Sequence, residues 1–206
     1  MTVEGGGFDS LSPCSGQDLV LFGDQWDRGY RYNSTSNSDL GKYEHGHTGH
    51  YVEGIAEHTK TKSILTVGTD GALNIWDSIH NKSSLRIPDV AGKSQVLTDL
   101  VIASNDMVVL AAFRDKSNIL VLPFVDIGKM DFIALDGGHM ANVTRLKNLR
   151  DAPMFISLSG ADIVGSIAIM TKTVLWESVF PPRKIAQYDG MGVVDCEASW
   201  SANLLF

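Results

Sequence analysis

The chain has 206 residues, of which 44% are hydrophobic and 20% charged, and its formal net charge is −7 at pH 7. This composition is that of an ordinary folded protein and excludes a disordered tail or a fibre. The negative charge repels phosphate backbones and anionic lipid, so no direct binding of nucleic acid or of a membrane surface is expected. The 20 glycines mostly separate short apolar runs, which predicts many short strands joined by tight turns.

Two features bear on the cellular compartment. Cys14 and Cys196 are the only cysteines and form no CxxC pair, so neither a disulfide framework nor a cysteine-rich zinc site is expected. The first residues lack the pattern of a signal peptide, and the longest apolar run, residues 107–113, is too short to span a bilayer. We therefore expect a cytoplasmic or nuclear protein with no membrane insertion.

Four segments share one pattern, in which an apolar run leads to a turn containing an aspartate and then to a second apolar run. In chain order they cover residues 19–32, 46–77, 108–122 and 155–170. Their turn aspartates are Asp27, Asp70, Asp115 and Asp162, separated by 43, 45 and 47 residues. A step this constant predicts a structural repeat, because four unrelated hairpins would not be spaced so evenly.

The second segment carries the most complete pattern. It opens with Gly46-His47, passes through a tight turn at Asp70 and closes with Trp76-Asp77. It resembles the WD-repeat family, whose unit opens with Gly-His, closes with Trp-Asp and forms one four-stranded propeller blade in roughly 40 to 45 residues. The strands implied here cover residues 52–56, 64–67, 73–76 and 84–87. Because a blade lies between its neighbours, its inner strands need not alternate between apolar and polar residues.

The resemblance implies an all-β chain, a WD-repeat β-propeller of about four blades plus part of a fifth in one domain, residues 1–206. The approximate blades are residues 1–40, 41–87, 88–134 and 135–186, with a partial blade at 187–206. Propellers of this family mostly close with seven blades, so an incomplete seven-bladed propeller is expected. Three accounts stay open: a piece of a longer protein, a chain lacking internal segments, or a propeller completed by another chain.

In WD repeats a His, an Asp, a Ser or Thr and a Trp commonly form a hydrogen-bonded network. The matching residues of the second segment are His47, Thr66, Asp70 and Trp76. In the fourth segment His139 and Asp162 repeat the spacing of 23 residues, and Met170 stands where the Trp is expected. We predict a structural role for these residues and no catalysis, because the imidazole, hydroxyl and carboxylate would satisfy one another.

His45, His47 and His50 also form a cluster of a kind that can bind zinc. We expect no metal there, because His47 belongs to the network and a glycine-rich turn directs side chains apart. The chain has no phosphate-binding glycine loop, HExxH motif or nucleophile elbow. Accordingly we expect no cofactor, no small-molecule substrate and no enzymatic activity.

The resemblance implies a rigid, non-catalytic scaffold whose loops dock protein subunits of a larger complex. The predicted contact residues lie in expected loops and have side chains typical of interface anchors; they are Trp26, Arg28, Tyr51 and Arg114. Two alternatives stay open. The chain could be the propeller region of a larger enzyme, or of a membrane-trafficking protein with a BEACH domain, whose propeller turn residues 23–32 resemble.

Overall fold

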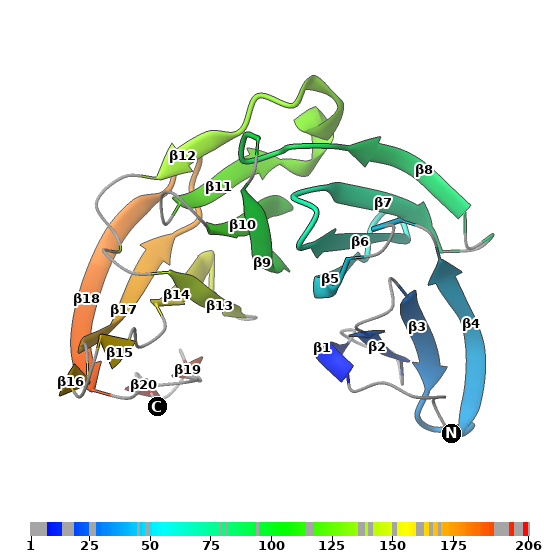
Figure 1. The fold of residues 1–206 in the computed structure, drawn as a ribbon, viewed down its shortest axis with the longest axis horizontal. Helices are drawn as coiled ribbons and strands as arrows, with labels where there is room; N and C mark the ends of the chain where they lie inside the picture. The colour runs from blue at the N-terminus through cyan, green and yellow to red at the C-terminus, as the bar shows by residue number, and fades with distance from the viewer. Residues whose placement is uncertain are drawn as a thin grey trace. The chain divides into compact units, whose positions relative to one another are not determined.

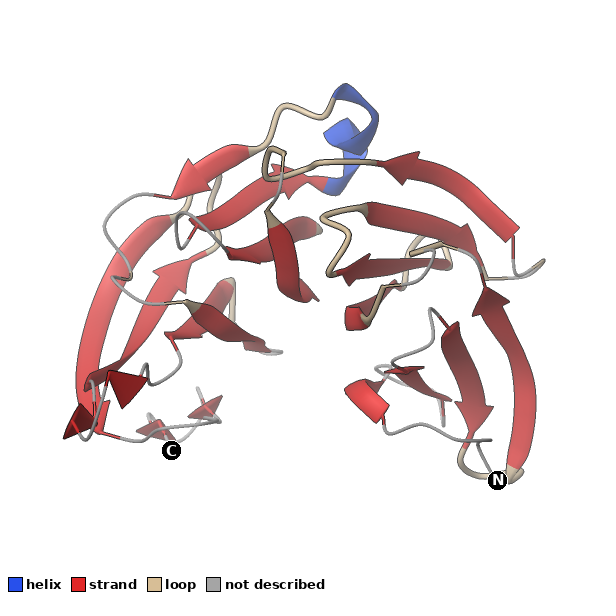
Figure 2. Cartoon of the chain, viewed as in Figure 1, coloured by secondary structure: helices blue, strands red, loops and turns tan. Residues whose placement is uncertain are grey.

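The structure is a computed structural model of the 206-residue chain, which folds into two compact units, Met1–Leu100 and Val101–Phe206. It describes residues 8–13, 19–24, 28–44, 46–47, 50–78, 80, 82–93, 95–113, 118–135, 139, 142–149, 152–159, 163–164, 167–168, 170–191, 198–199 and 204–205. Apart from one 3-10 helix, every regular element in these residues is a β-strand (Figures 1 and 2). Within them, no helix is long and apolar enough to cross a membrane.

The first unit contains the strands β1 (Phe8–Pro13), β2 (Leu19–Asp24), β3 (Arg28–Asn33), β4 (Ser38–Glu44), β5 (Val52–His58), β6 (Ser63–Gly68), β7 (Leu73–Asp77) and β8 (Lys82–Ile87). Strand β9 (Val96–Ile102) contains the boundary between the units. The second unit contains β10 (Met107–Phe113), β11 (Asn118–Pro123), the 3-10 helix η1 (Phe124–Lys129), β12 (Ile133–Leu135), β13 (Val143–Leu149), β14 (Met154–Ser159), β15 (Ile163–Val164), β16 (Ile167–Ala168), β17 (Met170–Glu177), β18 (Arg183–Met191), β19 (Ala198–Ser199) and β20 (Leu204–Leu205).

The described strands form four four-stranded sheets with antiparallel neighbours. The first sheet is β1–β4, the second β5–β8, the third β9–β12, and the fourth β13, β14, β17 and β18. The pairs β15–β16 and β19–β20 stand outside these sheets. In the first three sheets, strands adjacent in the sheet are also adjacent in the chain, so short connections are sufficient to join them. In the fourth sheet the pair β15–β16 lies between the paired strands β14 and β17.

Burial falls from the inner strands of a sheet to its outer strand. Strand β6 (SILTVG) and strand β10 (MVVLAAF) are buried at all but one residue each, whereas β8 (KSSLRI) is exposed except at Ile87. The inner strands are rich in Val, Ile and Leu on both faces because both faces are covered. Each strand predicted for the second segment lies within an observed strand.

One backbone hydrogen bond recurs at the same place in three sheets. The residue that follows the third strand donates its N–H to a carbonyl in the turn between the first two strands. The donor and acceptor residues are Ser78 and Lys62, Phe124 and Asp106, and Ser178 and Pro153, with N···O distances of 3.2, 2.8 and 2.7 Å. These three sheets are therefore copies of one structural unit.

Each unit has an aromatic core of its own. In the first, Tyr43 and Trp76 lie with ring centroids 5.3 Å apart and pack with Ile55 and Ile64. In the second, Phe155 and Trp176 stack 6.0 Å apart within a larger cluster drawn from β10, β11, β13, β14 and β17. The packed rings stabilise the contact between the inner strands of a sheet and the side chains that cover those strands.

The outer strands extend beyond the predicted blade limits. The first sheet continues to Glu44, which pairs with Arg28, and the fourth continues to Met191, which pairs with Met170. The limits expected at residues 40 and 186 therefore fall short by a few residues. The reason is that the outer strand pairs with the third strand along its whole length. Because the outer strands are polar, no apolar run in the sequence indicates how far they extend.

Candidate functional site

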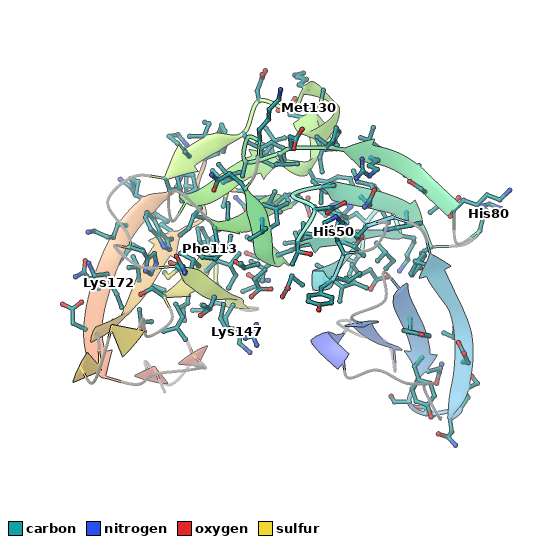
Figure 3. The ribbon with its side chains drawn as sticks, viewed as in Figure 1. His50, His80, Phe113, Met130, Lys147 and Lys172 are labelled. Carbon is teal, nitrogen blue, oxygen red and sulfur yellow. The ribbon has the colours of Figure 1, made fainter. Side chains whose placement is uncertain are left out.

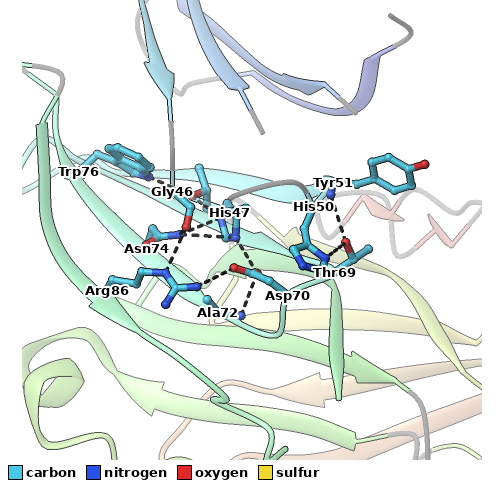
Figure 4. Close-up of polar contacts among 11 residues, drawn as sticks. Gly46, His47, His50, Tyr51, Thr69, Asp70, Ala72, Asn74, Trp76 and Arg86 are labelled. Carbon is cyan, nitrogen blue, oxygen red and sulfur yellow. Dashed lines mark hydrogen bonds and ion pairs between the residues drawn. The ribbon is translucent and has the colours of Figure 1, made fainter. Parts of the chain in front are cut away.

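Four of the predicted network residues lie together in the second sheet. The indole N–H of Trp76 donates to Thr66 Oγ1 over 2.9 Å, and Thr66 Oγ1 lies 2.9 Å from His47 Nε2. His47 Nδ1 lies 2.8 Å from Asp70 Oδ1 (Figure 4). Because a carboxylate only accepts, Nδ1 carries the proton, Nε2 accepts from the Thr66 hydroxyl, and that hydroxyl accepts from the indole. The result is one directional chain of hydrogen bonds.

Local geometry explains why these residue types stand here. Thr66 and Trp76 belong to the paired strands β6 and β7, and Asp70 lies in the turn between them. Gly46 precedes His47, and a Cβ on it would come within 2.3 Å of the Trp76 ring, so only glycine fits. Gly71 has a φ of +72°, a conformation that glycine adopts without strain and that lets the turn close. The Gly-His and Asp-Gly pairs are therefore steric requirements of the network.

Two further residues complete the network and were not predicted. The Asn74 amide donates to the Gly46 carbonyl over 2.8 Å and lies 3.0 Å from His47 Nε2. Arg86, from the outer strand β8, donates to Asp70 Oδ2 over 2.9 Å and to the same Gly46 carbonyl over 3.2 Å. A signal existed for Asn74, since an amide inside the run LNIW must find partners when buried. Arg86 had none, because an arginine in a polar strand resembles any surface residue.

The network keeps Asp70 ionised. Burial alone would raise the pKa of this carboxyl, but the hydrogen bond from the His47 imidazole, the N–H of Ala72 and the Arg86 guanidinium together lower it to about 2. His47 and Thr66 are each only 1% exposed. The hydroxyl is therefore held between an indole and an imidazole with almost no access to solvent, and the arrangement is suited to fixing the turn in place.

A small surface at the start of β5 lies next to the network. Tyr51 exchanges two hydrogen bonds with Thr69: its N–H donates to the Thr69 hydroxyl and its carbonyl accepts from the Thr69 N–H, both over 3.1 Å. His50 is exposed and lies 3.4 Å from the same hydroxyl. The Tyr51 side chain is 49% exposed (Figure 4), so a fixed backbone presents a partly free aromatic ring.

The structure describes only one of the other three predicted contact residues. Arg28, expected in a loop, is the first residue of β3, because the pairing with Glu44 extends the strand to it. Trp26 and Arg114 lie outside the described residues, as does His45 of the histidine cluster. Among the residues that are described, no group of three His, Cys, Asp or Glu side chains could hold a metal ion.

The fourth sheet contains a second network of the same kind. Its members are His139, whose Nε2 lies 2.6 Å from Ser157 Oγ, and Trp176, whose indole N–H donates to that oxygen over 2.7 Å. The placement of Met170 at the Trp position is therefore wrong, since Met170 is the first residue of β17. The pair β15–β16 is inserted before β17, so the Trp follows the hydroxyl residue by 19 positions, compared with 10 in the second sheet.

A sequence signal for Trp176 did exist. Trp176-Glu177-Ser178 parallels Trp76-Asp77-Ser78, and both serines are buried. Burial, with the positive charges of Lys172 and Lys184, lowers the pKa of His139 to about 4, so the imidazole is neutral at pH 7. Its buried Nδ1 has no hydrogen-bond partner among the described residues, and the predicted partner, Asp162, lies outside them.

The comparisons with known proteins gave different results for sequence and for fold. No model of a protein family matches the sequence, and no curated protein matches it either. In solved structures, the computationally designed Ika8 protein has a TM-score of 0.66 at 15% identity, over 93% of this chain and 52% of that chain. A chain of the Mitotic Checkpoint Complex has a TM-score of 0.63 at 12% identity, over 86% of this chain and 52% of that chain.

The chain thus spans about half the length of these two structures. At such low identity the likeness concerns the fold alone. Together with the four antiparallel four-stranded sheets, it confirms the predicted fold class. The chain is an all-β protein with the fold of a partial β-propeller, whose described residues form four four-stranded sheets and two shorter strand pairs, β15–β16 and β19–β20.

Proposed function

We propose that this chain is a WD-repeat propeller acting as a non-catalytic interaction module that docks protein subunits of a larger complex. The observation that carries the proposal is the buried network of the second sheet. Its His, Thr and Asp side chains, which in another setting could serve catalysis, are turned inward and satisfy one another. What they support at the surface is the fixed backbone around Tyr51.

Three further observations support this proposal. The pattern from Gly46-His47 to Trp76-Asp77 matches the contacts of the structure, since Gly46 adjoins the Trp76 ring and His47 accepts from Thr66. One similar solved structure is a chain of a multi-protein assembly, the Mitotic Checkpoint Complex. The net charge of −7 favours protein partners over nucleic acid.

The test is native capture of the tagged chain from its own cells, with quantitative mass spectrometry of the proteins that co-purify. We expect stoichiometric partners that are lost with Tyr51→Glu and retained with Tyr188→Glu, a matched control because Tyr188 is 52% exposed on β18. A chain that co-purifies with no stoichiometric protein would contradict the proposal. Equal loss of partners in both variants would contradict the part assigned to Tyr51.

A further inference from the structure

Two connections in the second unit expose large apolar side chains. At η1, Val125 is 87% and Met130 56% exposed, and Met130 projects from the ribbon (Figure 3). In the β17–β18 connection, Val179 is 51% and Phe180 43% exposed. Single exposed apolar residues are ordinary, but a group of four on connections of neighbouring sheets marks an interaction site.

A single turn, between β9 and β10, holds both connections. It accepts a hydrogen bond from the first residue of η1 and donates one to the residue just before Val179. It also donates to the turn between β13 and β14. The residue pairs are Phe124 with Asp106, Asn105 with Ser178, and Ser104 with Ala152. The two apolar connections therefore flank one polar turn, and hydrogen bonds to this turn fix the position of both.

The backbone that carries Val125 and Met130 is anchored before any partner arrives. Ile127 is buried, the Met130 N–H donates to its carbonyl over 3.4 Å, and Lys129 is ion-paired with Asp126. An ordered connection loses little conformational entropy on binding, so more of the contact energy appears as affinity. The fold thus keeps apolar surface in water at a fixed position.

The charges around these side chains select among partners. Lys129 is attracted by Asp126 and Asp131, and at the base of the other connection Arg183 is paired with Glu177. With Asp106 of the shared turn and the exposed Lys184 beside Arg183, four carboxylates stand against three cations, within a chain of net charge −7. This balance repels anionic lipid and attracts a segment that carries Lys or Arg beside its apolar residues.

We propose that the apolar end, formed by Val125, Met130, Val179 and Phe180, binds a segment of a protein partner whose apolar side chains are flanked by Lys or Arg. This inference rests on the proposed function, because the partner is a protein. It adds a second surface: Tyr51 adjoins the connection between second and third strands, whereas the apolar end uses connections between third and fourth strands. Tyr51 belongs to the first compact unit and the apolar end to the second.

The first test is photo-crosslinking in cells with the full chain, carrying p-benzoylphenylalanine at position 125, 180, 51 or 188. At 125 and 180 we expect adducts with one protein segment in which Lys or Arg lies close to the crosslinked apolar residue. Adducts with a second copy of this chain, adducts with an acidic segment, or no protein adduct at these positions would overturn the proposal. Adducts at 51 alone would overturn it while leaving the proposed function standing; none at any position would contradict both.

The second test measures affinity with the crosslinked segment as a labelled synthetic peptide. The variant Val125→Ser/Val179→Ser should weaken binding at least about tenfold, since it truncates two anchors, while Tyr188→Ser should bind like the wild type. Asp126→Lys/Asp131→Lys should also weaken binding, because it reverses the attracting charge. Equal affinity in all variants would overturn the proposal, as would wild-type binding to vesicles of equal parts phosphatidylserine and phosphatidylcholine.

Discussion

Thr66 Oγ1 serves two partners at once, since it accepts from the Trp76 indole and donates to the His47 imidazole. We predict that Thr66→Val lowers the free energy of unfolding by about 1 to 3 kcal/mol, because it leaves a buried indole N–H without an acceptor. Urea denaturation followed by tryptophan fluorescence measures this. Thr66→Ser keeps the hydroxyl and is the control; a loss as large as that of Thr66→Val would show that the methyl group, and not the hydrogen bonds, matters.

The lowered pKa of His139 predicts that the stability of the fold depends on pH in the mildly acidic range. Its pKa is about 4 in the folded chain and 6.5 when unperturbed, so the unfolded chain binds the additional proton first as the pH falls. Stability should therefore decrease from about pH 6.5 to about pH 4, by about 3 kcal/mol at most. Denaturation at a series of pH values measures this. His139→Gln should remove the slope and His80→Gln, at an exposed histidine, should keep it.

The lowered pKa of Asp70 predicts a second loss of stability, at lower pH. Its pKa is about 2 in the folded chain and 3.8 when unperturbed, so its contribution to stability is fully present above about pH 4 and decreases as the pH falls toward 2. Asp70→Asn should be less stable at pH 7 and should lose less between pH 4 and pH 2 than the wild type. Asp39→Asn removes an exposed carboxylate as a control. An unchanged slope in Asp70→Asn would contradict this assignment.

At the residue scale, the side chains that belong to a known motif were predictable from the sequence, whereas those set by tertiary position were not. His47, Thr66, Asp70 and Trp76 stand at motif spacing and meet as expected. Arg86 lies 16 residues from Asp70 on another strand, and only the pairing of β7 with β8 brings it near the carboxylate. Its role could not be read from composition or periodicity.

At the scale of elements, the two tryptophans should stabilise different sheets. Trp76 and Trp176 are 4% and 2% exposed, and each donates to a hydroxyl on the neighbouring strand. We predict that Trp76→Ala and Trp176→Ala each cost about 3 to 5 kcal/mol. Hydrogen exchange should accelerate most in β5–β8 for the first variant and in β13, β14, β17 and β18 for the second. Uniform acceleration in both would argue against separate structural units.

The elements that repeat were predictable and the departures from the repeat were not. The apolar runs of β6, β7, β10 and β14 are sufficient to identify strands. Helix η1 has no apolar periodicity of its own, because a single buried residue, Ile127, anchors it. The β15–β16 pair displaced Trp176 from its expected position, since the spacing in one repeat says nothing of an insertion in another.

At the scale of the whole molecule, the boundary between the compact units lies inside β9, after Leu100. A fragment of residues 101–206 would lack most of this strand and would leave an edge of β10 without its partner. We predict that a fragment of residues 89–206 is better folded and aggregates less than one of residues 101–206. Thermal melting and size-exclusion chromatography compare them; equal behaviour would show that β9 contributes little to the third sheet.

The fold class was predictable because it depends on a period, and a period survives when most of its motif residues are lost. Only the second segment retains both Gly-His and Trp-Asp, yet the third sheet forms with neither. Surface function behaves in the opposite way. Val125 and Phe180 are ordinary apolar residues in the sequence, and only their exposed positions beside one shared turn single them out.

The β15–β16 pair has a practical consequence for engineering. It lies between β14 and β17, which remain paired from Met154 with Glu177 to Leu158 with Thr173. Because that ladder is complete without the pair, chain length at this point is free to vary. The fourth sheet therefore offers an internal attachment point for an epitope or a fluorescent reporter, which would leave both chain termini available.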